Sequence, residues 1–195
     1  MAAIREAELM ESVKVLSVEV SRVNFLRIPE RKLMGGLNGV CKMASELVSE
    51  LLPDSIIGHD FEGGHNGHDA ASFVASRLAE KFATSFYVFP AYNGWPEERQ
   101  WNQFGSSRKI TDTLPLTFDL KNIQDKVITV HRSQKVFFDT IKGSSSYKLF
   151  SSREVLSLVV GSINYAEPPT VPLGYEYPNS KLRFNDFKKT VASIQ

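Results

Sequence analysis

The chain has 195 residues, of which 42% are apolar and 23% are charged, a composition typical of a soluble globular protein with a substantial core. The formal net charge is +1, so the chain has no basic surplus for a general nucleic-acid or membrane-surface role. Cys41 is the only cysteine, which excludes an intramolecular disulfide and a zinc site built from several thiolates.

The N-terminal residues and the most apolar segment bear on where the protein resides. The chain begins with charged residues at Arg5, Glu6, Glu8 and Glu11, so it lacks the apolar stretch of a signal peptide. The segment REVLSLVVGSINY is too short and too polar to span a bilayer. We therefore expect a cytoplasmic protein with no membrane span and no nucleic-acid partner.

The first half of the chain alternates between helical and extended patterns. Apolar residues recur at helical spacing in three segments, which predicts helices over 4–17, 37–52 and about 69–82. Short apolar runs bounded by turn residues predict strands over 21–29, 55–60 and 85–93. Helices of this length between short strands are typical of crossover units. We therefore predict an α/β fold with a Rossmann-like, mainly parallel sheet flanked by helices.

The start of the chain departs from this architecture. A parallel sheet normally begins with a central strand, and the loop after that strand helps to build the site. Here the chain opens with a predicted helix, so the first strand is missing. Such a sheet would expose unpaired backbone groups along one edge, which leaves oligomerisation through that edge open.

The second half is more irregular. It begins with a turn-rich excursion that holds Trp95 and Trp101, followed by one or two strands over 108–120. Helical patterns then predict a long helix over 121–142 and another over 151–165, and a proline-rich segment precedes a last helix. Because no internal repeat or low-complexity linker occurs, we predict a single domain over 1–195, in which 143–195 forms a C-terminal extension.

Three of the four histidines lie in the segment GHDFEGGHNGHDAASFVASRLAEKF. The segment follows a predicted strand and runs into a predicted helix, where ligands bind in parallel α/β sheets. His65 and His68 are three positions apart, so one imidazole can bind a metal while the other faces a substrate. The neighbouring glycines permit close backbone approach, and Asp69 is expected near the helix N-cap. The alternative is a polar surface turn whose histidines only bond the backbone.

His59 adds a second alternative, a local metal site made of His59, His65 and His68. Its H-x(5)-H-x(2)-H spacing matches none of the common zinc patterns. His131 falls within the predicted long helix, and we expect it to be structural.

The segment FEGGHNGHDAA resembles EGGHPDHDA of the LmbE/PIG-L-type zinc-dependent de-N-acetylases, which remove acetyl groups from N-acetylglucosamine-type amino sugars. Further similarities follow in the order of that family. They are the Arg5–Glu8 pair, the segments VNFLRIPE and FYVFPAYNG, and VHRSQKVFF around Ser133–Gln134. The resemblance extends over about residues 4–142.

The resemblance implies a hydrolase whose cofactor is zinc and whose substrate is an N-acetylated amino sugar or a related small amide. In such enzymes the metal polarises the amide carbonyl and activates a water, and a carboxylate takes the proton. By position, His68 matches the zinc-ligand histidine and His65 the catalytic histidine beside the oxyanion or leaving group. The implied substrate-binding residues are Arg5, Glu62, Asn66 and Tyr92, and the further site candidates are His59 and Asp69.

Two departures from the family pattern bear on activity. Asn66 and Gly67 replace the Pro and Asp between the two histidines, and the family's AHPDDE motif is missing. That motif supplies two zinc ligands and the general base, so this chain alone lacks them. We expect the chain to be a fragment of a longer protein. Two alternatives are that another chain supplies the motif, or that the protein is a degenerate member that has lost hydrolysis.

A degenerate protein would be a non-catalytic module that binds glycans or small molecules on the same fold. In that reading, exposed aromatic rings stack on the faces of sugars. The aromatic candidates are Tyr92, Trp95, Trp101 and Phe104.

Overall fold

The computed structural model describes residues 2–95, 98–105, 108–145, 147–169, 173–176 and 180–194. The chain divides into two compact units, which are described separately. The helical unit comprises Met1–Phe25 and Leu114–Glu154, and the sheet unit comprises Leu26–Thr113 and Val155–Gln195. The single domain expected over the whole chain stays a prediction.

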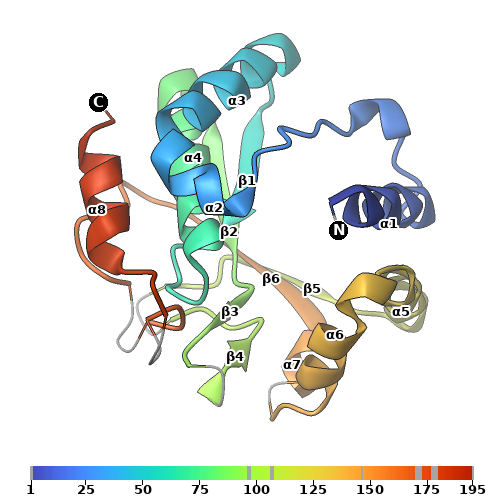
Figure 1. Cartoon of the computed structure of the whole chain (residues 1–195). Helices are drawn as coiled ribbons and strands as arrows, with labels where there is room; N and C mark the ends of the chain where they lie inside the picture. The colour runs from blue at the N-terminus through green and yellow to red at the C-terminus, as the bar shows by residue number, and fades with distance from the viewer. Residues whose placement is uncertain are drawn as a thin grey trace. The chain divides into compact units, whose positions relative to one another are not determined.

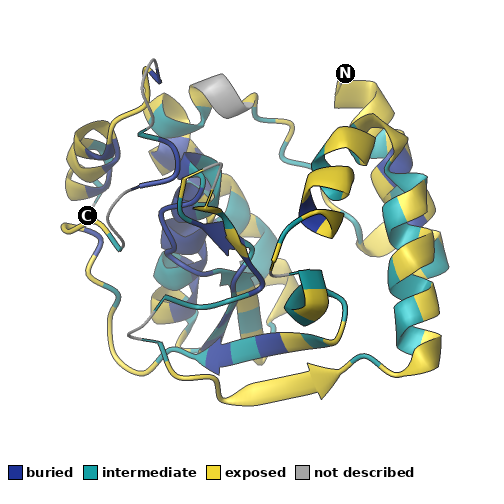
Figure 2. Cartoon of the chain, turned by 90° about the horizontal axis from the view of Figure 1, so that it is seen from below, coloured by how far each residue is buried: buried dark blue, intermediate teal, exposed yellow. Residues whose placement is uncertain are grey.

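The main sheet has the strand order β1-β2-β6-β5 among the described residues (Figure 1). β1 (Ser55–His59) and β2 (Ser85–Phe89) are parallel, and β2 pairs in antiparallel fashion with β6 (Arg153–Leu158). β5 (Asp112–Pro115) lies at the far edge and is exposed along its length, as Figure 2 shows. The predicted α/β class, with a parallel pair in a sheet flanked by helices, is confirmed.

β1 forms the other edge of the sheet. In the described part of the chain it pairs only with β2, and Ile57 is 58% exposed. The predicted strand over 55–60 is confirmed, although its residues are not deeply buried. Pairing of this edge with a further strand or with a second copy of the chain stays a prediction.

Helix α4 (Asn66–Phe82) packs on the sheet and is the centre of the sheet unit. Nine of its residues are buried, and it contacts α3 (Leu37–Leu51) and α8 (Phe184–Ala192). A Cβ on Gly58 would lie 2.9 Å from the Cβ of Ala75, so the glycine lets this helix approach β1 closely. Phe61, from the loop after β1, and Phe187 of α8 belong to the same core.

Smaller elements complete the sheet unit. They are α2 (Glu30–Leu33), the 3-10 helix η2 (Met34–Gly36), and a hairpin of β3 (Tyr92–Asn93) and β4 (Gln100–Trp101). The hairpin lies in the segment around Trp95 and Trp101 that the sequence predicts to be rich in turns.

The helical unit comprises α1 (Ala2–Val15), α5 (Phe118–Val130), α6 (Lys135–Lys142) and α7 (Tyr147–Phe150), with short 3-10 helices η1 (Val20–Arg22) and η4 (Arg132–Gln134). Thr117 caps α5 by accepting a hydrogen bond from the Leu120 N–H. The Ser12 hydroxyl and the His131 Nε2 atom are 2.9 Å apart, which ties α1 to the end of α5. Nowhere in the described part of the chain does a helix have the length and apolar run needed to cross a bilayer.

Three predicted elements are wrong. Residues 21–29 are not a strand: η1 occupies their start, and Arg27 has a φ of 51°, outside the extended region. The predicted helix over 121–142 is interrupted at His131, whose ψ of 60° ends α5 before η4 and α6 follow.

The third wrong prediction is the helix over 151–165. Its first part is strand β6, in which Val155 and Ser157 are buried while their neighbours are less so. This period of two fits a strand. β6 gains hydrogen bonds from distant partners, as when the Thr111 N–H donates to the Leu156 carbonyl at 3.0 Å. Tertiary pairing therefore overrides the helical pattern of the sequence.

Candidate metal centre

The histidine loop begins at the carboxyl end of β1 and turns directly into α4. The Asp60 N–H donates to the Phe89 carbonyl, which extends the β1–β2 pairing by one residue before the chain turns away. The fully buried Asp69 carboxylate then accepts hydrogen bonds from the Glu62 N–H at 3.2 Å and the Gly63 N–H at 3.0 Å. Asp69 is thus not the cap of α4; it lies in the first turn and fixes the loop before it.

His65 is the actual N-cap of α4. Its Nδ1 atom accepts a hydrogen bond from the Gly67 N–H at 3.0 Å. A neutral histidine whose Nδ1 atom accepts a hydrogen bond carries its proton on Nε2. The predicted helix start near residue 69 moves to Asn66, since His65 supplies the cap.

Glu62 and His68 form a polar side-chain pair within the loop. The Glu62 Oε1 atom lies 3.0 Å from His68 Nδ1, and Glu62 is only 2% exposed. The carboxylate also accepts hydrogen bonds from the backbone N–H groups of Ala91 at 2.9 Å and Tyr92 at 3.2 Å. Burial raises the pKa of Glu62 to about 8, and these two backbone bonds oppose that rise.

His59 completes the group from the end of β1. Its ring stacks on that of His68, with centroids 4.0 Å apart and planes 9° from parallel. Its Nδ1 atom is buried and has no hydrogen-bond partner among the described residues. Burial lowers the pKa of His59 to about 3, with the neighbouring His68 adding to the effect, so the ring is neutral and can donate a lone pair.

The donor atoms of His59, Glu62 and His68 all lie within 4.8 Å of one another. Two imidazoles and one carboxylate are a ligand set that zinc accepts in catalytic sites. Two ligands about 2.1 Å from a tetrahedral zinc are about 3.4 Å apart. The 3.0 Å contact between Glu62 and His68 is near that spacing, and the His59 Nδ1 atom has no partner among the described residues, so the three side chains could share an ion. His65, the third member of the predicted local site, is not in this group.

Aromatic side chains enclose His68. The Tyr92 ring meets it edge-on with centroids 5.1 Å apart, and Tyr92 in turn packs against Trp101. Both aromatic residues are buried, and the Arg99 guanidinium lies 4.6 Å from the Tyr92 ring centroid. Tyr92 therefore supports the His68 ring, and its predicted contact with substrate stays a prediction. The same holds for Asn66, which is buried at the start of α4; its Oδ1 atom has no hydrogen-bond partner within the described part of the chain.

Glycines allow three backbone segments to meet beside the loop. A Cβ on Gly64 would lie 1.8 Å from the Tyr92 carbonyl oxygen, and Gly63 has a φ of 70°. The Gly174 N–H donates to the Gly63 carbonyl at 2.7 Å. The predicted close approach at these glycines is thus made by the chain itself. No local pattern indicated that Gly174 would lie here, because it is more than a hundred positions away from the loop.

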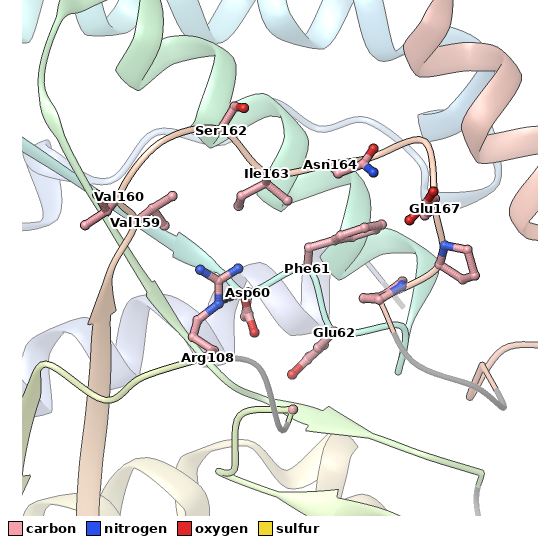
Figure 3. Close-up of a pocket in the computed structure, with 13 residues that line it drawn as sticks. Asp60, Phe61, Glu62, Arg108, Val159, Val160, Ser162, Ile163, Asn164 and Glu167 are labelled. Atoms are coloured by element: carbon pink, nitrogen blue, oxygen red, sulfur yellow. Dashed lines mark ion pairs between the residues drawn. The ribbon is translucent and has the colours of Figure 1, made fainter.

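A cavity of about 300 Å³ adjoins the loop and is lined in part by Glu62 (Figure 3). Within it, Arg108 Nε and Asp60 Oδ1 form an ion pair at 2.8 Å, and residues 159–169 arch over them. Burial raises the pKa of Asp60, and the Arg108 charge opposes the rise. Arg108, Asn164 and Glu167 belong to this cavity, although their local sequences carry no recognisable motif.

The helical unit brings together two of the segments quoted for the family resemblance. The Glu8 carboxylate accepts hydrogen bonds from the Ser133 N–H at 2.8 Å and the Ser133 hydroxyl at 2.6 Å. With the Gln134 amide oxygen turned toward Arg5, the guanidinium donates to it at 2.5 and 3.0 Å. The predicted role of Arg5 in substrate binding stays a prediction.

The fold and the histidine–glutamate cluster define an α/β protein with a candidate metal centre at the carboxyl end of a strand. No protein-family model matches the chain, and no curated protein matches it significantly. Solved structures of similar fold do exist, and those described next are all deacetylases.

The first is a deacetylase of teicoplanin biosynthesis, with 12% identity and a TM-score of 0.57 over 83% of this chain and 74% of that chain. The zinc-inhibited form of teicoplanin deacetylase Orf2 is 13% identical, with a TM-score of 0.56 over 83% of this chain and 75% of the other. The A40926 pseudoaglycone deacetylase Dbv21 is 8% identical, with a TM-score of 0.53 over 81% and 70%. At these identities the likeness establishes the fold.

Proposed function

We propose that the chain is a zinc-dependent hydrolase that removes the acetyl group from an N-acetylated amino sugar or a related small amide. The observation that carries the proposal is the convergence of His59, Glu62 and His68 donor atoms within 4.8 Å at the carboxyl end of β1. The likeness in fold to deacetylases, one of them in a zinc-inhibited form, supports it.

The residues present suit a zinc ion. His59, Glu62 and His68 would hold it, and the backbone N–H groups of Ala91 and Tyr92 orient the carboxylate. When bound, zinc supplies a Lewis acid that polarises a carbonyl and lowers the pKa of a coordinated water. His59 and Glu62 thereby stand in for two ligands that the related family takes from its AHPDDE motif.

His65 contributes a hydrogen-bond donor beside this cluster. Its ring centroid lies 5.2 Å from that of His68, and its Nδ1 atom is fixed by the Gly67 N–H. An imidazole N–H at this position can stabilise the negative charge that develops on the carbonyl oxygen during amide hydrolysis. We assign His65 this role.

Metal analysis combined with an activity assay tests the proposal. The full chain should contain close to one zinc ion per molecule and release acetate from N-acetylglucosamine or di-N-acetylchitobiose. His68→Ala should lose both properties, whereas His131→Ala, which removes the histidine of the helical unit, should retain the zinc. Zinc retained at full occupancy by His68→Ala would contradict the assigned site.

A second candidate function is a glycan-binding module without catalysis. The loop sequence favours it, because Asn66 and Gly67 replace the Pro and Asp that the family has between the two histidines, and a carboxylate is lost from the loop. In that case the protein would bind the two sugars without releasing acetate, with or without zinc.

A further inference from the structure

A turn from a distant part of the sheet unit lies against the histidine loop. It comprises residues 173–176, and the Glu176 N–H closes it by donating to the Leu173 carbonyl at 3.1 Å. The Gly174 N–H donates to the Gly63 carbonyl at 2.7 Å. The turn is therefore bonded to the loop through its backbone, although more than a hundred positions separate the two segments.

Packing and hydrogen bonds hold this turn in place. Leu173 is buried in the hydrophobic core of the sheet unit. Glu176 accepts a hydrogen bond from the Phe184 N–H at 2.5 Å, which ties the turn to the start of α8. A Cβ on Gly174 would lie 2.8 Å from the Gly64 carbonyl oxygen, so only glycine lets the turn approach the loop this closely.

Tyr175 brings a buried hydroxyl from this turn to the first turn of α4. The residue is 3% exposed and belongs to the same core. Its hydroxyl has no hydrogen-bond partner among the described residues, and the same is true of the Asp69 Oδ2 atom. Burial raises the pKa of the Tyr175 hydroxyl, and the Asp69 carboxylate raises it further, so the two groups are close enough to interact.

A phenol hydroxyl and a carboxylate oxygen suit each other as donor and acceptor. A buried polar atom without a partner costs free energy, and such atoms in folded proteins are nearly always hydrogen bonded. The Oδ1 atom of Asp69 already accepts from the N–H groups of Glu62 and Gly63, so Oδ2 is the oxygen that remains. One hydrogen bond from Tyr175 to Oδ2 would satisfy both buried atoms.

Such a bond would act on the candidate metal centre through the backbone of the loop. The Asp69 carboxylate holds the Gly63 N–H, while the Gly174 N–H holds the carbonyl of the same glycine. Glu62 directly precedes Gly63, and its N–H is also held by Asp69. Its carboxylate lies 3.0 Å from His68. The position of the Glu62 carboxylate therefore depends on how firmly the turn and Asp69 hold this backbone.

We infer that Tyr175 donates a hydrogen bond to the Asp69 Oδ2 atom and is a positioning residue for the histidine loop. It acts through Asp69 on the backbone of Glu62 and Gly63. The inference rests on the proposed function only in its consequence for zinc: a loosened loop holds the Glu62 carboxylate less firmly beside His68, so the metal binds more weakly.

Tyr175→Phe in the full chain tests the inference, because it removes the hydroxyl and keeps the buried ring. Hydrogen exchange of the Glu62 and Gly63 amides, followed in the zinc-free chain, should accelerate about three- to tenfold, the factor that corresponds to the net loss of one hydrogen bond. Zinc affinity, measured by competition with a chelator, should fall by a similar factor. Unchanged exchange of both amides would overturn the inference.

Tyr165→Phe is the matched control. Tyr165 is a buried tyrosine of the same core, and its hydroxyl pairs with the Ser72 hydroxyl of α4 at 3.0 Å. This variant should leave the exchange of the Glu62 and Gly63 amides and the zinc affinity unchanged, even where the free energy of unfolding falls. Equal effects of Tyr165→Phe and Tyr175→Phe would overturn the inference, because they would reflect a general loosening of the core.

Zinc binding separates this inference from the proposed function. A chain that binds no zinc, but whose amide exchange accelerates in Tyr175→Phe alone, would support the positioning role and contradict the proposed function. A chain that binds zinc with the same affinity in Tyr175→Phe as in the parent would overturn the inference and leave the metal centre standing.

Discussion

The Oε1 atom of Glu62 lies 3.0 Å from the Nδ1 atom of His68, although the two residues are six positions apart and separated by a turn. The contact exists because the Asp69 carboxylate holds the Glu62 backbone N–H, while the backbone after β2 holds the Glu62 carboxylate. A strand end, a helix start and a neighbouring loop thus converge on one buried acid. This convergence distinguishes the loop from a polar surface turn.

Replacing Glu62 by glutamine tests the contribution of its charge. The amide keeps the size of the side chain but cannot become an anionic ligand at the position that faces His68. Zinc affinity, measured by competition with a chelator, should fall at least about tenfold. Circular dichroism should show an unchanged fold. An affinity equal to that of the parent chain would remove Glu62 from the site.

Gly64 should tolerate no side chain. A Cβ would meet the Tyr92 carbonyl oxygen at 1.8 Å, so Gly64→Ala must displace the backbone and should cost at least about 1–3 kcal/mol. The matched control is Gly39→Ala in α3, where a Cβ has nothing within 4 Å and should stabilise by up to about 1 kcal/mol. Urea unfolding measures both changes, and equal effects would refute the contact at Tyr92.

Asp69 should act mainly as a buried acceptor. Asp69→Ala leaves the N–H groups of Glu62 and Gly63 without their partner, at about 1–3 kcal/mol for each orphaned donor. Asp69→Asn retains an oxygen that can accept from both, so it should cost less than half as much in the free energy of unfolding. If the two variants are equally destabilised, the hydrogen bonds are not what holds the loop.

Acid stability of the helical unit should depend on Ser133. Hydrogen bonds from the Ser133 hydroxyl and N–H hold the pKa of Glu8 below its ordinary value in the folded chain. The stabilisation is therefore present above the unfolded pKa and is lost as the pH falls through the folded pKa. Ser133→Ala removes one of these hydrogen bonds and so raises the pKa of Glu8 in the folded chain. The helical circular-dichroism signal should therefore begin to fall at a higher pH on acidification.

The control for this measurement is Ser152→Ala, in the same unit, whose hydroxyl donates only to the carbonyl of Leu149 among the contacts described. Its acid transition, followed by circular dichroism, should coincide with that of the parent chain. Coincident transitions for Ser133→Ala and the parent chain would show that the Ser133 hydroxyl does not lower the pKa of Glu8.

The helices over 4–17 and 37–52 and the strands after residues 54 and 84 follow from the sequence because their signals are local. Apolar spacing and turn residues act over a few positions, and α1, α3, β1 and β2 need no distant partner to be recognised. The strand β6 is different. Its sequence suits a helix, and its hydrogen bonds come from β2 and from residues near β5.

By itself, the sequence determined the α/β class and the position of the histidine loop, since glycines, histidines and a helix start lie together within one short segment. Only the tertiary structure decided which donors meet: Glu62 joins His59 and His68, while His65 caps the helix. The reason is that convergence depends on groups supplied by other segments. The N–H groups of Ala91 and Tyr92 fix the Glu62 carboxylate, and no pattern within the loop encodes their position.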